Sequence, residues 1–347
     1  MELIQELTQR GLIEGATSDR IADMLKQDTP LSVYCGFDPT ADCLHLGHLV
    51  PIVGLAWFRK YGHKTVALVG GATGLIGDPS GKSTERVLLG ASQLEINVKG
   101  VKQVLDSILS RTTGVYDVIH ANNQDWFESI GCLEFLRDIG KHFRVGTMVS
   151  RESVRARLAS EEGLSFTEFA YQLLQAYDFY RLFKNYGVTL QLGGSDQWGN
   201  ITAGIDFIRR LAGEEAFGMT FPLLLKSDGK KFGKSESGAI WLSESKLSVY
   251  DFYQYLLRTS DEDVIKLLKI LTFVDLDVIE SLQKGMSSSG YVPHTAQKLF
   301  ADEITKFVHG EEALIRAKEI TQRAKPGQID TVFSKDTGTR TRSDSSG

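Results

Sequence analysis

Short apolar runs alternate with longer helical stretches along the first two thirds of this chain, and this alternation is what most limits its fold. The runs at 31–37 and 66–69 each end in a turn signal, Asp38-Pro39 and Gly70-Gly71 respectively. Alternating strands and helices predict a parallel α/β sheet, whose ligands bind beyond the carboxyl ends of the strands. We therefore predict an α/β fold with strands at 31–37, 66–69, 115–119 and 188–192, and with helices at 47–61 and 166–184.

Strand signals end near Ser248, and the sequence that follows has helical spacing of its apolar residues. The last stretch is rich in Ser, Thr and Gly and has almost no apolar residues, so we expect it to be disordered. Helices are predicted at 251–257, 263–272, 277–284 and 295–309. The predicted division is a parallel-sheet domain at 1–222, a loop and connection at 223–247, a smaller all-helical domain at 248–330 and a disordered polar tail at 331–347.

Composition excludes several classes of protein. The 347 residues contain no apolar run of membrane-spanning length, and the N-terminus lacks the basic flank of a signal peptide. Three cysteines form no CxxC pair, which favours a reducing compartment. We expect a cytoplasmic protein, or the mature form of an organellar one. The net charge of -5 gives no support to nucleic-acid binding through overall charge, so an RNA partner requires a local basic face.

Two histidines flank a glycine where the helix after the first strand begins, in the segment His45-Leu46-Gly47-His48. A helix N-terminus attracts phosphate, and histidines there can donate hydrogen bonds to phosphate oxygens. The alternative is a pair of surface histidines near a turn. No cysteine or third histidine lies at a ligand spacing, so we expect no protein-bound metal.

The glycine-rich segment 70–83 follows the second strand and contains Asp78 and Lys82. Only three residues separate Gly77 from Gly81, so the spacing of a P-loop is absent, and the dinucleotide fingerprint fails as well. We interpret the segment as a flexible loop suited to an amine or a nucleotide. An ordinary glycine-rich turn is the alternative.

Tyr171, Gln175 and Asp178 lie at positions i, i+4 and i+7 of a predicted helix and therefore share one face. A phenol, an amide and a carboxylate together can recognise a zwitterion and a hydroxyl, although such a stripe is more often a solvated face. Tyr34, inside the first strand, would need a partner for its hydroxyl if buried.

Two further polar clusters follow later in the chain. Asp196 comes after the strand at 188–192, where it is placed either as a ribose-binding carboxylate or as a helix cap. The segment 226–235 carries four lysines and two glycines. It reads either as a solvated charge run or as a mobile cationic loop for a departing polyphosphate.

The segments His45-Leu-Gly-His48 and Lys231-Phe-Gly-Lys-Ser235 resemble the two signature motifs of class I aminoacyl-tRNA synthetases. Their order, on either side of the strand–helix alternation, makes the resemblance specific. It narrows to tyrosyl-tRNA synthetases of bacterial or organellar type through the stretches at 34–40, 69–80, 171–178 and 191–200, and it covers roughly residues 1–325. The resemblance implies a Rossmann-like nucleotide-binding catalytic domain that joins tyrosine to tRNA(Tyr) at the expense of ATP.

The resemblance also implies roles for individual residues. Those expected on tyrosine are Tyr34 and Asp178 at the phenolic hydroxyl, Asp78, Tyr171 and Gln175 at the α-ammonium group, and Gln197 near the carboxylate. Those expected on ATP are Cys35, Gly36, Asp38, His45, Gly47, His48, Gly194, Asp196 and Lys234. Catalysis is expected to depend on Thr40, His45, His48, Lys82, Arg86, Lys231 and Lys234, chiefly at the phosphates.

Partners follow from the same resemblance: tRNA(Tyr), L-tyrosine, ATP with Mg²⁺, and a second copy of the chain through an apolar interface around 135–166. Family members usually continue into a C-terminal RNA-binding domain. Because 331–347 is polar, we expect this domain to be missing, adenylate formation to survive and transfer to tRNA to be weak. Arg209 and Arg210 are expected to touch the acceptor stem. Pro51, near the start of the helix after the histidine pair, is a departure that we expect to be tolerated.

Three rival functions fit these residues less well. A tryptophanyl-tRNA synthetase has no use for paired phenol-reading groups such as Tyr34 and Asp178. A catalytically silent RNA-binding or splicing relative has no need of intact His45 and Lys231. A nicotinamide dehydrogenase lacks its glycine fingerprint here.

Overall fold

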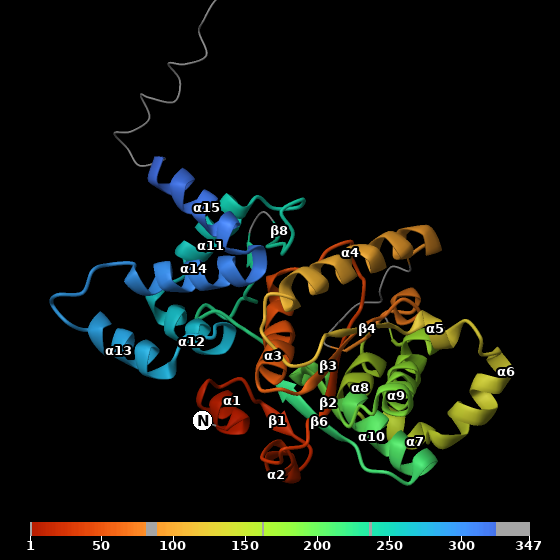
Figure 1. Ribbon diagram of the computed structural model, residues 1–347. Helices are drawn as coiled ribbons and strands as arrows, with labels where there is room; N and C mark the ends of the chain where they lie inside the picture. Colours follow the sequence, from red (N-terminus) through yellow and green to blue (C-terminus); the bar gives the residue numbers. More distant parts are fainter. Residues whose placement is uncertain (1, 81–88, 162, 236–237, 324–347) are drawn as a thin grey trace, which may run out of the picture.

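A six-stranded, mostly parallel sheet forms the centre of the protein (Figure 1). The computed structural model describes residues 2–80, 89–161, 163–235 and 238–323, so the predicted tail at 331–347 lies outside the described residues. Four parallel pairings follow the chain's alternation of strands and helices, and only the edge strand β1 is antiparallel to its neighbour. In sheet order the strands are β1 (Gly15–Ala16), β6 (Phe217–Phe221), β5 (Leu190–Gly194), β2 (Ser32–Phe37), β3 (Lys64–Val69) and β4 (Ile119–Asn122).

Helices cover both faces of the sheet. Side chains alternate along β2. Val33 and Cys35 join one core with α3 (Leu49–Lys60) and α4 (Ala91–Leu109), while Tyr34 joins a second core with α9 (Phe166–Tyr186) and α10 (Trp198–Ala212). The sheet part contains the helices α1 (Leu3–Gln9), α2 (Arg20–Leu25), α3 (Leu49–Lys60), α4 (Ala91–Leu109), α5 (Gln124–Phe127), α6 (Cys132–Glu134), α7 (Val145–Val149), α8 (Glu152–Leu158), α9 (Phe166–Tyr186) and α10 (Trp198–Ala212). Short turns of 3-10 helix are η1 (Leu46–His48), η2 (Thr73–Leu75), η4 (Gly140–His142) and η5 (Ser195–Gln197), and η3 (Phe135–Ile139) is a π-helical turn.

A group of helices follows the sheet part, and most of them pack against α14 (Thr295–His309). No strand follows Ala239 in the described part of the chain. The helices are α11 (Val249–Leu257), α12 (Asp261–Leu271), α13 (Leu276–Met286), α14 (Thr295–His309) and α15 (Glu311–Arg323), and between the two parts lies a small hairpin of β7 (Lys234–Ser235) and β8 (Gly238–Ala239). The predicted class, a parallel-sheet domain followed by a smaller helical part, is therefore confirmed.

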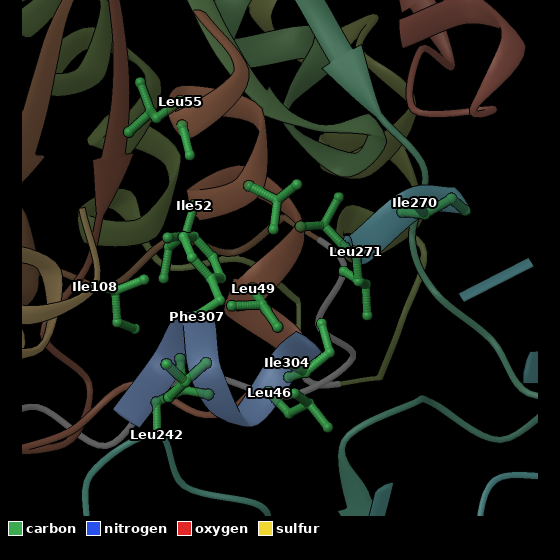
Figure 2. Close-up of a cluster of buried hydrophobic side chains, with 14 of the residues drawn as sticks. Leu46, Leu49, Ile52, Leu55, Ile108, Leu242, Ile270, Leu271, Ile304 and Phe307 are labelled. Carbon is green, nitrogen blue, oxygen red and sulfur yellow. The ribbon is translucent and has the colours of Figure 1, made fainter. Parts of the chain in front are cut away.

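One continuous hydrophobic core joins the helical part to the sheet part. Figure 2 shows Leu49 and Ile52 of α3 beside Phe307 and Ile304 of α14, with Ile270 and Leu271 of α12 close by. These side chains are all buried. The helical part is thus held against α3 by the same kind of packing that stabilises a single domain.

Arg10, directly after α1, fastens the end of α12. Its guanidinium donates to the carbonyl oxygens of Lys269, Thr272 and Val274 at 3.1, 3.0 and 2.7 Å, and it pairs with Glu6 at 2.7 Å. Only 2% of Arg10 is exposed. Lys269 lies in the last turn of α12, whose carbonyls have no partners within the helix, and Arg10 satisfies its carbonyl together with two carbonyls just beyond the helix end.

Strand prediction succeeds where the apolar run is buried and fails where it is not. The strands predicted at 31–37 and 66–69 are present as β2 and β3, and the one at 188–192 begins two residues later as β5. The strand predicted at 115–119 is wrong, because pairing starts only at Ile119. Val115 is 79% exposed, and Arg59 donates to the carbonyl of Tyr116, which holds this segment in a loop.

Candidate active site

A cavity of about 430 Å³ opens at the carboxyl ends of β2, β3 and β5, where an open α/β sheet binds its ligands. Each strand leads into a polar segment, so residues that are far apart in sequence meet there. The cavity brings together the predicted residues Tyr34, Cys35, Gly36, Asp38, Thr40, His45, Gly47, His48, Asp78, Tyr171, Gln175, Asp178, Gly194, Asp196, Gln197 and Lys231. Lys82 and Arg86 lie outside the described residues.

Asp178 forms part of the buried end of the cavity. It is 2% exposed, and its two carboxylate oxygens accept hydrogen bonds from Trp126 Nε1 at 2.8 Å and from Asn123 Nδ2 at 3.0 Å. Burial raises the pKa of Asp178 to about 8, and the two N–H donors oppose the rise. Two donors, one on each oxygen, therefore fix the orientation of this carboxylate.

Tyr34 reaches the same end of the cavity because its position in β2 points it toward α9, the helix of Asp178. Its ring packs against Phe179 with centroids 5.2 Å apart. Its hydroxyl is buried and has no hydrogen-bond partner among the described residues. Burial, and then the charge of Asp178, raise the pKa of Tyr34 well above its usual value, so the phenol stays protonated.

Asp38 binds two neighbours at the wall of the cavity. Tyr171 donates from its hydroxyl to one carboxylate oxygen at 2.8 Å, and Thr73 donates to the other at 2.9 Å. Gly70 permits this pairing, because a Cβ there would lie 2.3 Å from the Asp38 carboxylate. Residues 70–80 of the predicted glycine-rich loop therefore form a packed turn at this point, and residues 81–83 lie outside the described residues.

Asp78 is the centre of an amide network. Gln197 donates to it at 2.7 Å and the backbone N–H of Ser80 donates at 2.9 Å. Asn200 donates to Gln175 at 3.1 Å and also lies within reach of Asp78. The stripe of Tyr171, Gln175 and Asp178 is consequently no solvated face: Asp178 is 2% and Tyr171 5% exposed.

The other half of the cavity has an open backbone surface. Gly36 is exposed, and a Cβ added there would meet no protein atom closer than Leu68 at 3.9 Å. The fold therefore does not require glycine at this position. Cys35 is buried, and burial raises the pKa of its thiol to about 12, which makes it a poor nucleophile.

Asp196 lies inside η5 and does not cap α10. The residue that precedes α10 is Gln197, which makes no side-chain cap, so the interpretation of Asp196 as a helix cap is wrong. Burial, and then the charge of Asp78, raise the pKa of Asp196, while a hydrogen bond with Gln197 and, more weakly, the charge of Lys231 lower it. Asp196 and Lys231 both line the cavity.

Both rings of the histidine segment, residues 45–48, accept hydrogen bonds from its own backbone. The Nδ1 of His45 accepts the backbone N–H of Gly47 at 3.1 Å, and the Nδ1 of His48 accepts that of His45 at 3.2 Å. The two rings lie 4.0 Å apart, both at the cavity. Pro51 is the third residue of α3, where its missing N–H has no intrahelical acceptor to lose.

The lysine segment, residues 226–235, packs on the histidine segment through its backbone. Gly233 has φ of +86°, and a Cβ there would lie 2.9 Å from the backbone nitrogen of Gly47. Ile240 accepts the N–H of Leu46 at 2.7 Å and donates to Gly233 at 3.0 Å. Lys234 follows directly as the first residue of β7.

Sequence reasoning missed four residues that hold the predicted ones: Thr73, Asn123, Trp126 and Asn200. Each bonds a carboxylate or amide of the cavity while lying on a different element. Thr73 and Asn200 lie within the stretches at 69–80 and 191–200 that carry the resemblance, whereas Asn123 and Trp126 lie outside every stretch that the sequence singled out.

Two negative findings concern the described residues alone. They contain no group of three or more His, Cys, Asp or Glu side chains that could hold a metal ion. None of their helices has both the length and the apolar character needed to cross a bilayer.

The sequence and the fold match one family over most of the chain. Residues 26–324 match the family described as tRNA synthetases class I (W and Y). The tyrosine–tRNA ligase of Protochlamydia amoebophila is 56% identical over 92% of this chain and 75% of its own length. The chloroplastic/mitochondrial tyrosine–tRNA ligase of Arabidopsis thaliana is 54% identical over 94% of this chain and 65% of its own length.

Solved structures of tyrosyl- and tryptophanyl-tRNA synthetases have a similar fold. A C-terminally truncated mitochondrial tyrosyl-tRNA synthetase from Aspergillus nidulans superposes with a TM-score of 0.82 at 29% identity, over 93% of this chain and 94% of that one. A tryptophanyl-tRNA synthetase from Encephalitozoon cuniculi has a TM-score of 0.64 at 13% identity, which shows a shared fold alone. The chain belongs to the class I tRNA synthetases, within the tyrosine–tRNA ligase family.

Proposed function

We propose that this chain activates tyrosine with ATP, forming tyrosyl-adenylate and pyrophosphate, and then transfers the tyrosyl group to the 3′ end of tRNA(Tyr). The observation that carries the choice of amino acid is the pair of Asp178 and Tyr34 at the buried end of the cavity. A carboxylate that accepts and a phenol that donates match the two hydrogen-bonding capacities of a phenolic hydroxyl. Tryptophan offers only an N–H donor, and phenylalanine offers neither capacity.

The remaining acids and amides suit the other end of the amino acid. Asp78 and Asp38 lie near Tyr171 and Gln175, and this negative region attracts an α-ammonium group. The substrate's carboxylate then points toward Gln197 and the ATP half of the cavity. Because that carboxylate is ionised at neutral pH, its attack on the α-phosphorus needs no general base. Catalysis consists of positioning and of charge stabilisation.

The half of the cavity assigned to ATP contains residues that can position the nucleotide and stabilise charge on its phosphates. The exposed backbone at Gly36 allows ATP to lie against β2, and Asp196 is assigned to the ribose. The rings of His45 and His48, together with Thr40, are assigned to the phosphates, and Lys231 to the leaving pyrophosphate. Mg²⁺ would arrive with ATP and neutralise phosphate charge.

We further propose that two copies of the chain associate through the segment between α5 and α9. Within the predicted interface at 135–166, Leu136, Val145 and Phe166 are 48%, 64% and 75% exposed, and exposed large apolar side chains are typical of association surfaces. Arg209 and Arg210 at the end of α10 are assigned to the tRNA acceptor stem. We place the enzyme in the cytoplasm or inside an organelle, and we divide it at 222 and 247 as the sequence predicts. Sedimentation of Phe166→Asp should show a smaller species than the unmodified chain, whereas unchanged sedimentation would contradict the interface.

ATP–pyrophosphate exchange with each amino acid tests the activity directly. Tyrosine should support exchange, and tryptophan and phenylalanine should not at equal concentration. Asp178→Asn keeps the shape of the side chain but removes the charge that Asp178 carries above its pKa of about 8. At pH 8.5 it should therefore lower kcat/KM for tyrosine by about 10- to 100-fold, the cost of losing a charged hydrogen bond. Exchange that depends on another amino acid, or an Asp178→Asn variant with full preference for tyrosine, would refute the assignment. Charging of tRNA(Tyr) tests the second step.

A further inference from the structure

The loop that carries Lys231 is fastened at both ends to the helical part of the protein. Near its start, the backbone N–H of Ser227 donates to Asp263 Oδ1 of α12 at 2.9 Å. Near its end, the backbone N–H of Gly233 donates to the hydroxyl of Tyr255 on α11 at 3.2 Å. Neither Tyr255 nor Asp263 is among the residues that line the cavity.

Asp263 is itself held in place by burial and by a hydrogen bond from α12's N-terminal side. It is 9% exposed, and its second oxygen accepts a hydrogen bond from Ser260 at 2.8 Å. Moving a buried carboxylate that accepts a hydrogen bond on each oxygen costs free energy, because both bonds would be lost and no hydrogen bonds to water would replace them. The start of the loop is therefore fixed to the first turn of α12.

Tyr255 holds the other end through its hydroxyl and its ring. The ring contacts Phe232 with centroids 6.1 Å apart, and Lys226 Nζ lies 5.6 Å above it. Phe232 is 5% exposed and sits beside Lys231 in the chain. Gly233 in turn packs on Gly47 of the histidine segment. A shift of this end would thus move the lysine relative to the histidines.

We propose that Tyr255 and Asp263 are positioning residues for the activation step: they fix the 226–233 loop on the helical part and so set where Lys231 meets the phosphates. This inference rests on the proposed function. The loop's lysine acts on charge that develops as pyrophosphate leaves, so its position should affect the rate of adenylate formation more than the binding of tyrosine. The helical part would then contribute to catalysis without touching a substrate.

Tyr255→Phe tests the proposal, because it removes one oxygen and keeps the ring. The matched control is Tyr253→Phe on the same helix, because the Tyr253 hydroxyl donates to Asp302 at 2.9 Å and, among the described residues, forms no hydrogen bond to the 226–233 loop. Single-turnover formation of tyrosyl-adenylate should slow about fivefold in Tyr255→Phe, the effect of one ordinary hydrogen bond. The Kd for tyrosine should not change. Tyr253→Phe should keep the rate, even though it loses comparable stability.

A double-variant cycle separates positioning from general destabilisation. With Lys231→Ala present, Tyr255→Phe should no longer slow the reaction, because the group that it positions is gone. Asp263→Asn should behave as Tyr255→Phe does. Equal rates for the Tyr255→Phe and Tyr253→Phe proteins, or a full fivefold effect in the Lys231→Ala background, would overturn the inference and leave the proposed function intact. An unmodified chain without tyrosine-dependent exchange would overturn both.

Discussion

Tyr34→Phe should raise the free energy of unfolding of the ligand-free protein and lower kcat/KM for tyrosine. The substitution removes only the hydroxyl oxygen and keeps the ring packed on Phe179. In the free protein that oxygen is buried and has no hydrogen-bond partner among the described residues. A buried polar group without a partner costs about 1–3 kcal/mol, so its removal should stabilise the chain by about 1 kcal/mol.

The same oxygen should contribute to recognition of tyrosine. If it donates to the substrate's hydroxyl, its loss removes one neutral hydrogen bond, worth about 1 kcal/mol or about fivefold in kcat/KM. Most of the preference over phenylalanine should remain, because Asp178 still accepts from that hydroxyl. Stability and activity therefore change in opposite directions, as expected for a group kept for function at a cost to folding.

Urea denaturation at 25 °C and ATP–pyrophosphate exchange measure the two effects. Tyr253→Phe is the control, since its hydroxyl already has Asp302 as a partner. That variant should lose about 1 kcal/mol of stability and keep its kcat/KM. A Tyr34→Phe protein that is less stable than the unmodified chain, or that uses tyrosine as well as before, would refute the reasoning.

Three further changes test other parts of the structure. Tyrosine binding should tighten between pH 6.5 and 8.5, because Asp178, whose pKa burial raises to about 8, ionises in this range and only the carboxylate accepts the phenolic hydroxyl well; calorimetry on Asp178→Asn should show a flat profile. Arg10→Met should lower the free energy of unfolding by about 3–5 kcal/mol, because it leaves Glu6 and three backbone carbonyls without their partner. Urea denaturation measures this, and a loss below about 1 kcal/mol would contradict it. Gly36→Ala should fold normally, with its nearest protein atom 3.9 Å away, yet raise the KM for ATP at least several-fold; an unchanged KM would place the nucleotide elsewhere.

The parallel sheet could be predicted because its central strands are short, apolar and closed by glycine or proline. The edge of the sheet could not. The segment around Val115 has the same apolar character as a buried strand, but Arg59 binds its backbone and leaves Val115 in solvent. Helix α4 is not among the helices predicted from the sequence, although Leu94, Val101 and Leu105 lie at helical spacing along it.

The candidate site divides in the same way. Residues with unusual chemistry at helical or motif spacing, such as Asp178 and His45, can be singled out from the amino-acid sequence alone. Their supports cannot, because nothing in the sequence distinguishes Trp126 from other tryptophans until β4 and α9 place it 2.8 Å from Asp178. The glycines after β3 suggest flexibility, whereas Gly70 makes room for Asp38 beside Thr73.

The backbone contact between Gly233 and Gly47 has a consequence for redesign of this enzyme. Any side chain at position 233 would strike the backbone nitrogen of Gly47 and would also have to adopt a left-handed conformation. Substitutions in one of the two segments therefore change which residues the other tolerates, although nearly two hundred positions separate them in the chain. A library intended to alter nucleotide use should randomise both segments in the same clones. If only one segment is varied, the unchanged backbone of the other limits which side chains can be accepted.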